Sequence, residues 1–146
     1  MATTIDRLDC WVLRAPIAEP VLLLDGERSG LVNNVAVMSN VSSSYAPAGK
    51  HLVVAALPNV IDGDLAAVAR TQLRTWWGPQ VDAWVHLRTY RIAHAGVEQR
   101  PPFHPKRNIA LGNGVFVCGD HRDTGSSQGA LFSGRRCGEL VAGALA

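Results

Sequence analysis

The sequence has little of what marks several large classes of protein. Only 6% of its residues are aromatic, 18% are charged, and the formal net charge is +2. A charge so near balance argues against a dedicated nucleic-acid binder, which gathers Lys and Arg in a patch. No apolar run approaches the ~20 residues of a membrane-spanning helix. The first ten residues contain acids and no apolar core, so we expect neither a signal peptide nor a membrane span.

The cysteines and histidines lack the spacing of a metal site. Cys10, Cys118 and Cys137 form no C-x-x-C pair, and the five histidines show no H-E-x-x-H motif. Two of the cysteines lie in apolar stretches, which predicts buried free thiols in a reducing, cytoplasmic compartment. A G-x-G-x-x-G dinucleotide-binding motif is also missing, because Gly112-Asn113-Gly114 is followed by Val115, Phe116 and Val117. The sequence therefore predicts no metal centre and no complete dinucleotide-binding unit.

The first sixty residues have the pattern of a β-meander, which predicts a largely antiparallel or mixed sheet. Its strands are expected in four short apolar runs, 10–14, 21–24, 31–39 and 52–54. A helix is expected next, with Asp62 as its N-cap and Gly78-Pro79 at its end, because apolar residues recur at helical spacing between them. Trp76-Trp77 is expected to pack into the core, and residues 81–92 predict a further strand.

The last part of the chain predicts a strand, a polar turn and a helix. Residues 115–118 are an apolar run after the tight turn at 112–114, and a helix rich in small residues is expected to start near Ser127. Ala130, Gly134, Cys137 and Val141 are expected on one face of that helix. Asp120 directly follows the expected buried strand, where a carboxylate can accept hydrogen bonds from a ligand hydroxyl. The first turn of the helix offers N–H donors to a carbonyl or an anion.

These motifs resemble a known family. Cys118-Gly119-Asp120, Gln128-Gly129-Ala130 and Ser133-Gly134-Arg135-Arg136 are similar to the C-terminal flavin motif of the FAD-dependent amine oxidase, protoporphyrinogen oxidase and phytoene desaturase superfamily. The resemblance extends upstream through Val32-Asn33-Asn34, Ser44-Tyr45-Ala46-Pro47 with Gly49-Lys50, and Leu87-Arg88-Thr89-Tyr90-Arg91-Ile92. It implies an α/β architecture, which is α+β in this isolated piece, in which residues 1–108 are part of a β-rich substrate domain with a mixed, largely antiparallel sheet and one main helix. Residues 109–146 are then the last strand and C-terminal helix of a Rossmann-like FAD-binding domain.

The resemblance also implies roles for individual residues. Gly119 and Asp120 are expected at the ribityl or pyrophosphate part of FAD, and Ser127, Gln128, Gly129 and Ala130 at the isoalloxazine ring. The reaction implied is hydride transfer from a C–N or C–C bond of a small-molecule substrate to the flavin, for which no catalytic side chain can be named. Since the motif for the ADP half is missing, the chain is expected to bind FAD weakly or not at all alone. The other half of the site is then expected on a second chain that carries the dinucleotide-binding domain.

Two alternatives stay open. One is a non-catalytic domain that has kept the sheet and lost the cofactor. The other is a serine hydrolase with Ser127 as nucleophile, because Gly125-Ser126-Ser127-Gln128-Gly129 matches G-x-S-x-G. That match departs from a nucleophile elbow, since six residues separate it from its strand and no histidine follows Ser127.

Overall fold

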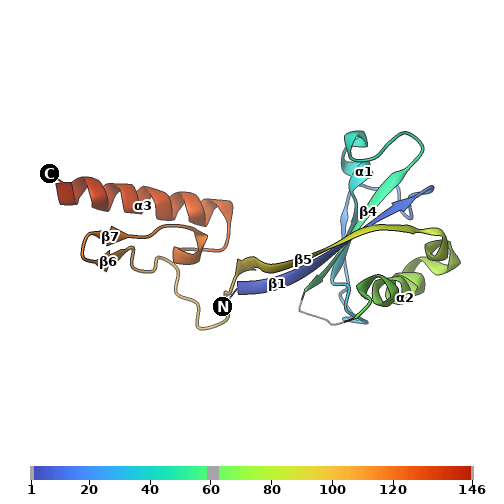
Figure 1. The fold of residues 1–146 in the computed structure, drawn as a ribbon, viewed down its shortest axis with the longest axis horizontal. Helices are drawn as coiled ribbons and strands as arrows, with labels where there is room; N and C mark the ends of the chain where they lie inside the picture. The colour runs from blue at the N-terminus through green and yellow to red at the C-terminus, as the bar shows by residue number, and fades with distance from the viewer. Residues whose placement is uncertain (1, 59–62, 146) are drawn as a thin grey trace. The chain divides into compact units, whose positions relative to one another are not determined.

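The computed structural model describes residues 2–58 and 63–145, and the chain forms an α+β fold (Figure 1). It divides into two compact units: an N-terminal unit, Thr4–Ala93, and a C-terminal unit formed mainly by residues 94–145. The expected combination of an antiparallel sheet, one main helix and a C-terminal helix is confirmed. None of the described helices is long and apolar enough to cross a membrane.

A five-stranded sheet in the order β2-β3-β4-β1-β5 forms the framework of the N-terminal unit. Its strands are β1 (Ala2–Val12), β2 (Leu22–Leu24), β3 (Asn34–Val37), β4 (His51–Pro58) and β5 (Val85–Val97). β2, β3 and β4 form the expected antiparallel meander, and β1 pairs antiparallel with the other edge of β4. Between β3 and β4 lie two short helices, α1 (Met38–Val41) and η1 (Ser43–Tyr45).

The first strand differs from its prediction. Residues 10–14 were expected to be extended, but β1 begins at Ala2 and ends at Val12, and Leu13 beyond it is 82% exposed. Within β1 the apolar side chains Leu8, Cys10 and Val12 are buried on one face of the strand, and Asp9 on the other face is buried beside Arg7, whose guanidinium donates to it at 2.9 and 2.8 Å. Asp6 is buried on the same face as Leu8. Because Asp6 is a carboxylate at a core position, residues 2–9 do not form an apolar run, and the start of β1 was not predicted.

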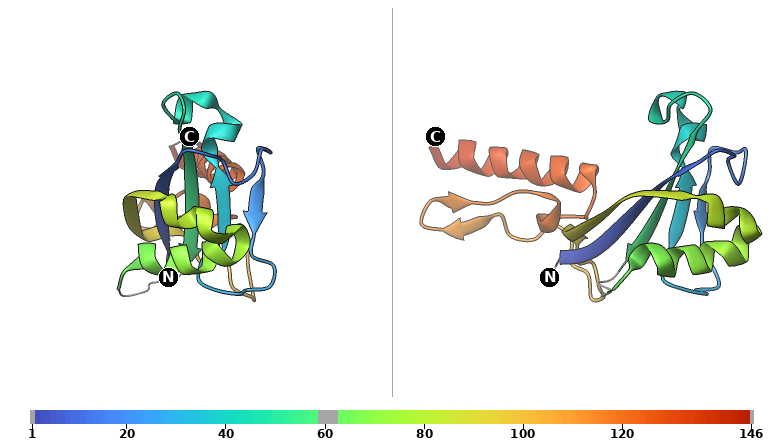
Figure 2. Two further views of the ribbon diagram at one scale, coloured as in Figure 1. Left: turned by 90° about the vertical axis from the view of Figure 1, so that its right-hand side faces the viewer. Right: turned by 45° about the vertical axis from the view of Figure 1, so that its right-hand side comes forward.

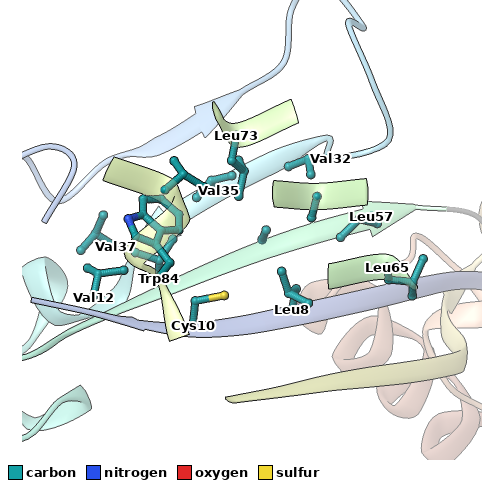
Figure 3. Close-up of a cluster of buried hydrophobic side chains, with 14 residues drawn as sticks. Leu8, Cys10, Val12, Val32, Val35, Val37, Leu57, Leu65, Leu73 and Trp84 are labelled. Carbon is teal, nitrogen blue, oxygen red and sulfur yellow. The ribbon is translucent and has the colours of Figure 1, made fainter. Parts of the chain in front are cut away.

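Helix α2 (Leu65–Trp77) covers one face of the sheet and closes the core (Figures 2 and 3). The Asp64 carboxylate caps it, accepting the N–H groups of Ala66 and Ala67 at 3.0 and 3.1 Å; the expected cap, Asp62, lies outside the described residues. The helix ends at Gly78, whose φ of +69° glycine adopts without steric cost. Trp76 and Trp77 are partly buried against the core, so their expected packing role is confirmed.

The strand expected at residues 81–92 begins later than predicted. Residues Gly78–Ala83 form the short helix η2, and β5 starts only at Val85. The Arg70 guanidinium holds the end of η2, donating to the carbonyl oxygens of Val81, Asp82 and Trp84 at 3.2, 3.0 and 3.0 Å. Val81 is apolar and completely buried, and it therefore packs into the core from a helical turn rather than from a strand.

A buried amide joins α2 to the loop before β3. Gln72 Nε2 donates to the carbonyl oxygen of Val32 at 2.9 Å, and Gln72 Oε1 accepts the Val32 N–H at 2.7 Å. Nε2 also donates to the Asp25 carboxylate at 2.9 Å. The side chain thus satisfies both backbone groups of a fully buried residue, as a neighbouring strand would.

The C-terminal unit is a β-hairpin with a long helix beside it (Figure 1). Its elements are β6 (Ala110–Gly112), β7 (Val115–Phe116), the short helix η3 (Asp120–Arg122) and α3 (Ser127–Leu145). The expected start of the helix at Ser127 is confirmed. The strand expected at 115–118 shortens to Val115–Phe116, and the expectation that it is buried is wrong, since Val115 is 54% exposed. In the described part of the chain β7 pairs with β6 alone, so no second strand covers its other edge.

The face of α3 that packs against the unit also differs from the expected one. Gly129 and Ser133 are its buried residues, whereas Ala130 is exposed and Gly134 is only half-buried. The expected stripe of small residues is therefore rotated from the packed face. Cys118 is exposed and Cys137 half-buried, so of the three thiols only Cys10 is buried as expected.

Candidate functional site

The hairpin turn sets the path of the chain into the candidate site. Gly112, Asn113 and Gly114 have φ values of +93°, +53° and +73°, a left-handed turn that reverses β6 into β7. After β7 the Val117 N–H donates to the Ile109 carbonyl oxygen at 2.9 Å, which prolongs the pairing beyond the hairpin. The expected tight turn is therefore confirmed, and it delivers Cys118 and Gly119 to the side of α3.

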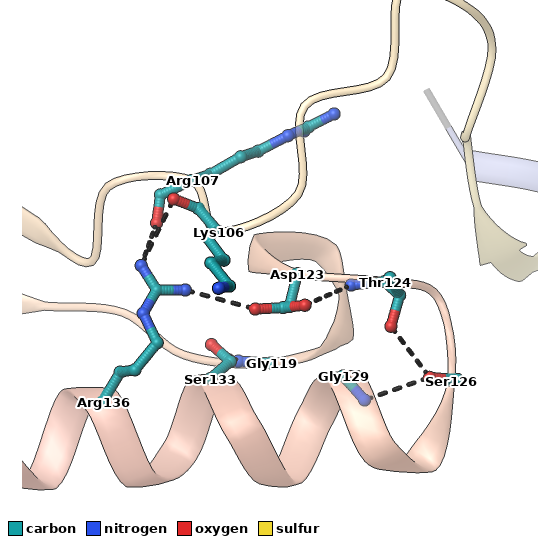
Figure 4. A network of polar contacts seen from close by, with 9 residues as sticks. All are labelled: Lys106, Arg107, Gly119, Asp123, Thr124, Ser126, Gly129, Ser133 and Arg136. Carbon is teal, nitrogen blue, oxygen red and sulfur yellow. Dashed lines mark hydrogen bonds and ion pairs between the residues drawn. The ribbon is translucent and has the colours of Figure 1, made fainter.

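Gly119 connects the hairpin to η3. Its φ is +141°, and its N–H donates to the hydroxyl of the fully buried Ser133 at 3.1 Å (Figure 4). The turn after it closes through the Arg122 N–H to the Gly119 carbonyl oxygen and the Asp123 N–H to the Asp120 carbonyl oxygen, both at 3.0 Å. Backbone bonds thus set the position of Asp120, which leaves its carboxylate available.

A partly buried ion pair holds η3 to the helix. Asp123 is 8% exposed, and its carboxylate accepts the Thr124 N–H at 3.0 Å and the Arg136 guanidinium at 3.3 Å. Arg136 also donates to the carbonyl oxygens of Lys106 and Arg107, at 3.3 and 3.0 Å (Figure 4). Sequence reasoning missed this role of Arg136, because its partners lie far from it along the chain and no local pattern marks them.

Ser126 caps the start of α3 and accepts some of the N–H groups in its first turn. The Ser126 hydroxyl accepts the Gly129 N–H at 3.0 Å, and the Ser126 carbonyl oxygen accepts the Ala130 N–H at 2.9 Å. Within the described part of the chain, the N–H groups of Ser127 and Gln128 have no acceptor. Of the four residues expected at the flavin ring, Ser127 and Gln128 therefore offer free donors, and Gly129 and Ala130 do not.

Asp120 lines an open pocket of about 600 Å³ within the C-terminal unit. The other lining residues come from the end of β5, the loop after it and η3: His94, Ala95, Gly96, Val97, Glu98, Arg100, Arg107 and His121. The pocket therefore combines the carboxylates of Asp120 and Glu98 with the guanidinium groups of Arg107 and Arg100, and Arg100 pairs with Glu98 at 3.1 Å. The residues Ser127, Gln128, Gly129 and Ala130 do not line it, so the expected site falls into two adjoining parts.

One buried donor in η3 has no protein partner. The Arg122 Nε–H is buried without a hydrogen bond to any described residue. An unsatisfied buried donor costs about 1–3 kcal/mol, so such a group is unusual in a folded protein. Its place in the same turn as Asp120 adds a second polar feature to this side of the unit.

The structure gives little support for a metal site or for a serine nucleophile. No group of three or more His, Cys, Asp or Glu side chains among residues 2–58 and 63–145 could hold a metal ion. Ser127 is exposed, and in the described chain it forms no hydrogen bond with a histidine, which a serine nucleophile requires as its base. These observations argue against the hydrolase alternative.

Comparison with known proteins shows a shared fold. No protein-family model and no curated protein matches the sequence. A solved structure of a protein from Pyrococcus furiosus matches 97% of this chain with a TM-score of 0.63 and 14% identity. An oxidoreductase from Methanosarcina mazei matches 96% of it with a TM-score of 0.54 and 13% identity. The chain spans about one third of the length of each, 32% and 34% respectively.

Proposed function

We propose that this chain is the C-terminal portion of an FAD-dependent oxidoreductase of the amine-oxidase type. The observation that carries the proposal is the turn at Gly119, where η3 is locked to α3 by backbone and side-chain bonds and presents Asp120 to a pocket. This is the order of groups that the sequence resemblance implies for the ribityl end of FAD. The fold shared with an oxidoreductase of Methanosarcina mazei supports the same class of activity.

The residues present fit the cofactor in three respects. The Asp120 carboxylate suits ribityl hydroxyls, which are hydrogen-bond donors, and Arg107 in the same pocket suits a phosphate. The free N–H groups of Ser127 and Gln128 at the positive end of α3 suit the electron-rich carbonyl edge of the flavin ring. Bound FAD would supply the acceptor for a hydride from a small-molecule substrate.

A second chain is proposed to complete the cofactor site. The hairpin and α3 expose large apolar side chains: Leu111, Val115, Leu131, Phe132 and Leu145. Leu131 and Leu145 are 75% and 83% exposed, and large apolar side chains that form a contiguous exposed patch usually mark an interaction surface. A dinucleotide-binding domain has the chemistry to cover this surface and to hold the ADP half of FAD.

Flavin binding tests the proposal. The chain alone is expected to bind FAD weakly or not at all, whereas the chain mixed with a G-x-G-x-x-G domain from the same genome is expected to retain flavin through gel filtration. In that complex Asp120→Asn is expected to weaken FAD binding about tenfold, since one charge-assisted hydrogen bond contributes roughly 1.5–3 kcal/mol. Fluorescence titration measures the affinity of the complex for FAD. Glu139→Gln on the exposed face of α3 is the matched control and should leave the affinity unchanged.

Two outcomes would overturn parts of the proposal. Stoichiometric flavin retained by the chain alone would contradict the need for a second chain. Absence of flavin with every candidate N-terminal partner would instead support a non-catalytic domain that has kept the fold.

A further inference from the structure

Two of the three cysteines meet in the C-terminal unit. The Gly119 N–H donates to the Ser133 hydroxyl at 3.1 Å, which places the residue before it, Cys118, beside α3. Ser133 and Cys137 lie four residues apart on this helix, and residues with that spacing share one face. The segment that carries Cys118 therefore lies along the face of α3 that carries Cys137. Cys118 is exposed and Cys137 half-buried, so a small thiol-reactive molecule can reach the pair.

The surroundings of the thiols agree with this placement. Burial raises the pKa of Cys137, and the neighbouring Cys118 raises that pKa further through its charge and a thiol–thiol hydrogen bond. Cys10 has a different environment, because it lies under α2 in the core and burial raises its pKa to about 11. Cys10 is buried, whereas Cys118 is exposed and Cys137 half-buried, so Cys10 is the least accessible of the three thiols.

We propose that Cys118 and Cys137 are a redox-active pair that closes to an intramolecular disulfide and ties the segment before η3 to α3. The closed loop contains Gly119, Asp120 and the start of α3, so oxidation would hold these residues in the arrangement that the Gly119–Ser133 hydrogen bond already favours. A cross-link between elements that are already in contact needs little rearrangement. The proposal rests on the two thiols alone and does not depend on flavin binding.

The oxidant is a low-molecular-weight disulfide such as glutathione disulfide. The exposed Cys118, as thiolate, attacks one sulfur of that disulfide and releases one glutathione thiolate, forming a mixed disulfide. The Cys137 thiolate then attacks the Cys118 sulfur and releases the second glutathione thiolate. The two protons lost by the cysteines return to the released thiolates. Two electrons thus pass from the protein pair to glutathione disulfide.

Thiol counting on the full chain tests the pair. After incubation with glutathione disulfide, the chain is expected to have lost two hydrogen atoms in mass, and its thiols are then counted after denaturation. It should contain a Cys118–Cys137 cross-linked peptide and one free thiol, that of Cys10. The oxidised chain should also show slower hydrogen exchange across η3 and the first turns of α3, and dithiothreitol should reverse both effects.

Single variants separate the two steps. Cys137→Ser should trap glutathione on Cys118 as a stable adduct, and Cys118→Ser should yield no intramolecular disulfide. Cys10→Ser is the control and should form the bond as the parent does; circular dichroism checks that each variant is folded. Three free thiols after oxidation, a persistent glutathione adduct on the parent chain, or a disulfide only between two chains would each overturn the proposal.

Discussion

Replacing Gly129 with alanine is expected to destabilise the C-terminal unit by about 1–3 kcal/mol, the usual cost of forcing an extra methyl group into a packed site. A Cβ at this position would overlap the carbonyl oxygen of Thr124, and the Thr124 hydroxyl would lie only 2.6 Å away. The carbonyl cannot rotate aside, because it also accepts the Ser126 N–H at 2.7 Å. Urea denaturation followed by circular dichroism at a helical wavelength, with hydrogen exchange of α3, measures the effect.

The same substitution at Gly134, further along α3, provides the control. A Cβ at Gly134 would meet no atom within 4 Å, so Gly134→Ala is expected to stabilise the helix by roughly 0.5–1 kcal/mol through the higher helix propensity of alanine. The two variants should therefore differ in sign. Equal stabilisation by both would show that the turn from Thr124 to Ser126 is not packed against Gly129.

Replacing Gln72 with alanine is expected to lower the free energy of unfolding of the N-terminal unit by about 2–5 kcal/mol. The substitution removes the partners of the Val32 N–H and C=O groups, which are fully buried, and each unsatisfied group costs roughly 1–3 kcal/mol. The Asp25 carboxylate loses its amide partner as well. Chemical denaturation gives the free energy, and faster exchange of the Val32 amide would locate the loss.

Gln80→Ala is the comparison for Gln72. Gln80 is exposed and its amide donates one hydrogen bond, to the Trp77 carbonyl oxygen at 2.9 Å. Water can replace that bond, so the change is expected to stay within about 0.5 kcal/mol. A similar loss for both variants would contradict the role assigned to the buried amide.

The site shows how the helix start can be stabilised and still offer donors. Ser126 accepts the N–H groups of Gly129 and Ala130, which anchors the first turn, and the N–H groups of Ser127 and Gln128 have no acceptor among the described residues. The Asp123–Arg136 ion pair keeps η3 against the helix without using Asp120. The residues proposed to bind the cofactor are thus different from the residues that support the turn, as a preorganised site would require.

Much of the fold could be predicted because the signals are local. The Gly78 helix stop, the left-handed turn at Gly112-Asn113-Gly114 and the helix start at Ser127 each depend on the backbone preference or capping of neighbouring residues. The predictions failed where contacts between residues far apart in the sequence decide the local structure. Asp6 takes a buried place in β1, and Val81 joins the core from η2, whose end the Arg70 side chain holds.

The sequence by itself determined the α+β class, the order of the main strands and helices, and Asp120 at the turn before the last helix. Hydrophobic periodicity and turn-forming residues, on which these predictions depend, can be recognised from residues that are close together in the sequence. Only the tertiary structure decided the pairing of β1 with β4, the Gln72–Val32 bonds and the Asp123–Arg136 ion pair. It also decided that Gly119 meets Ser133 and brings Cys118 beside Cys137. These contacts join residues far apart along the chain, and they form only when packing of the sheet and helices has closed the loops between them.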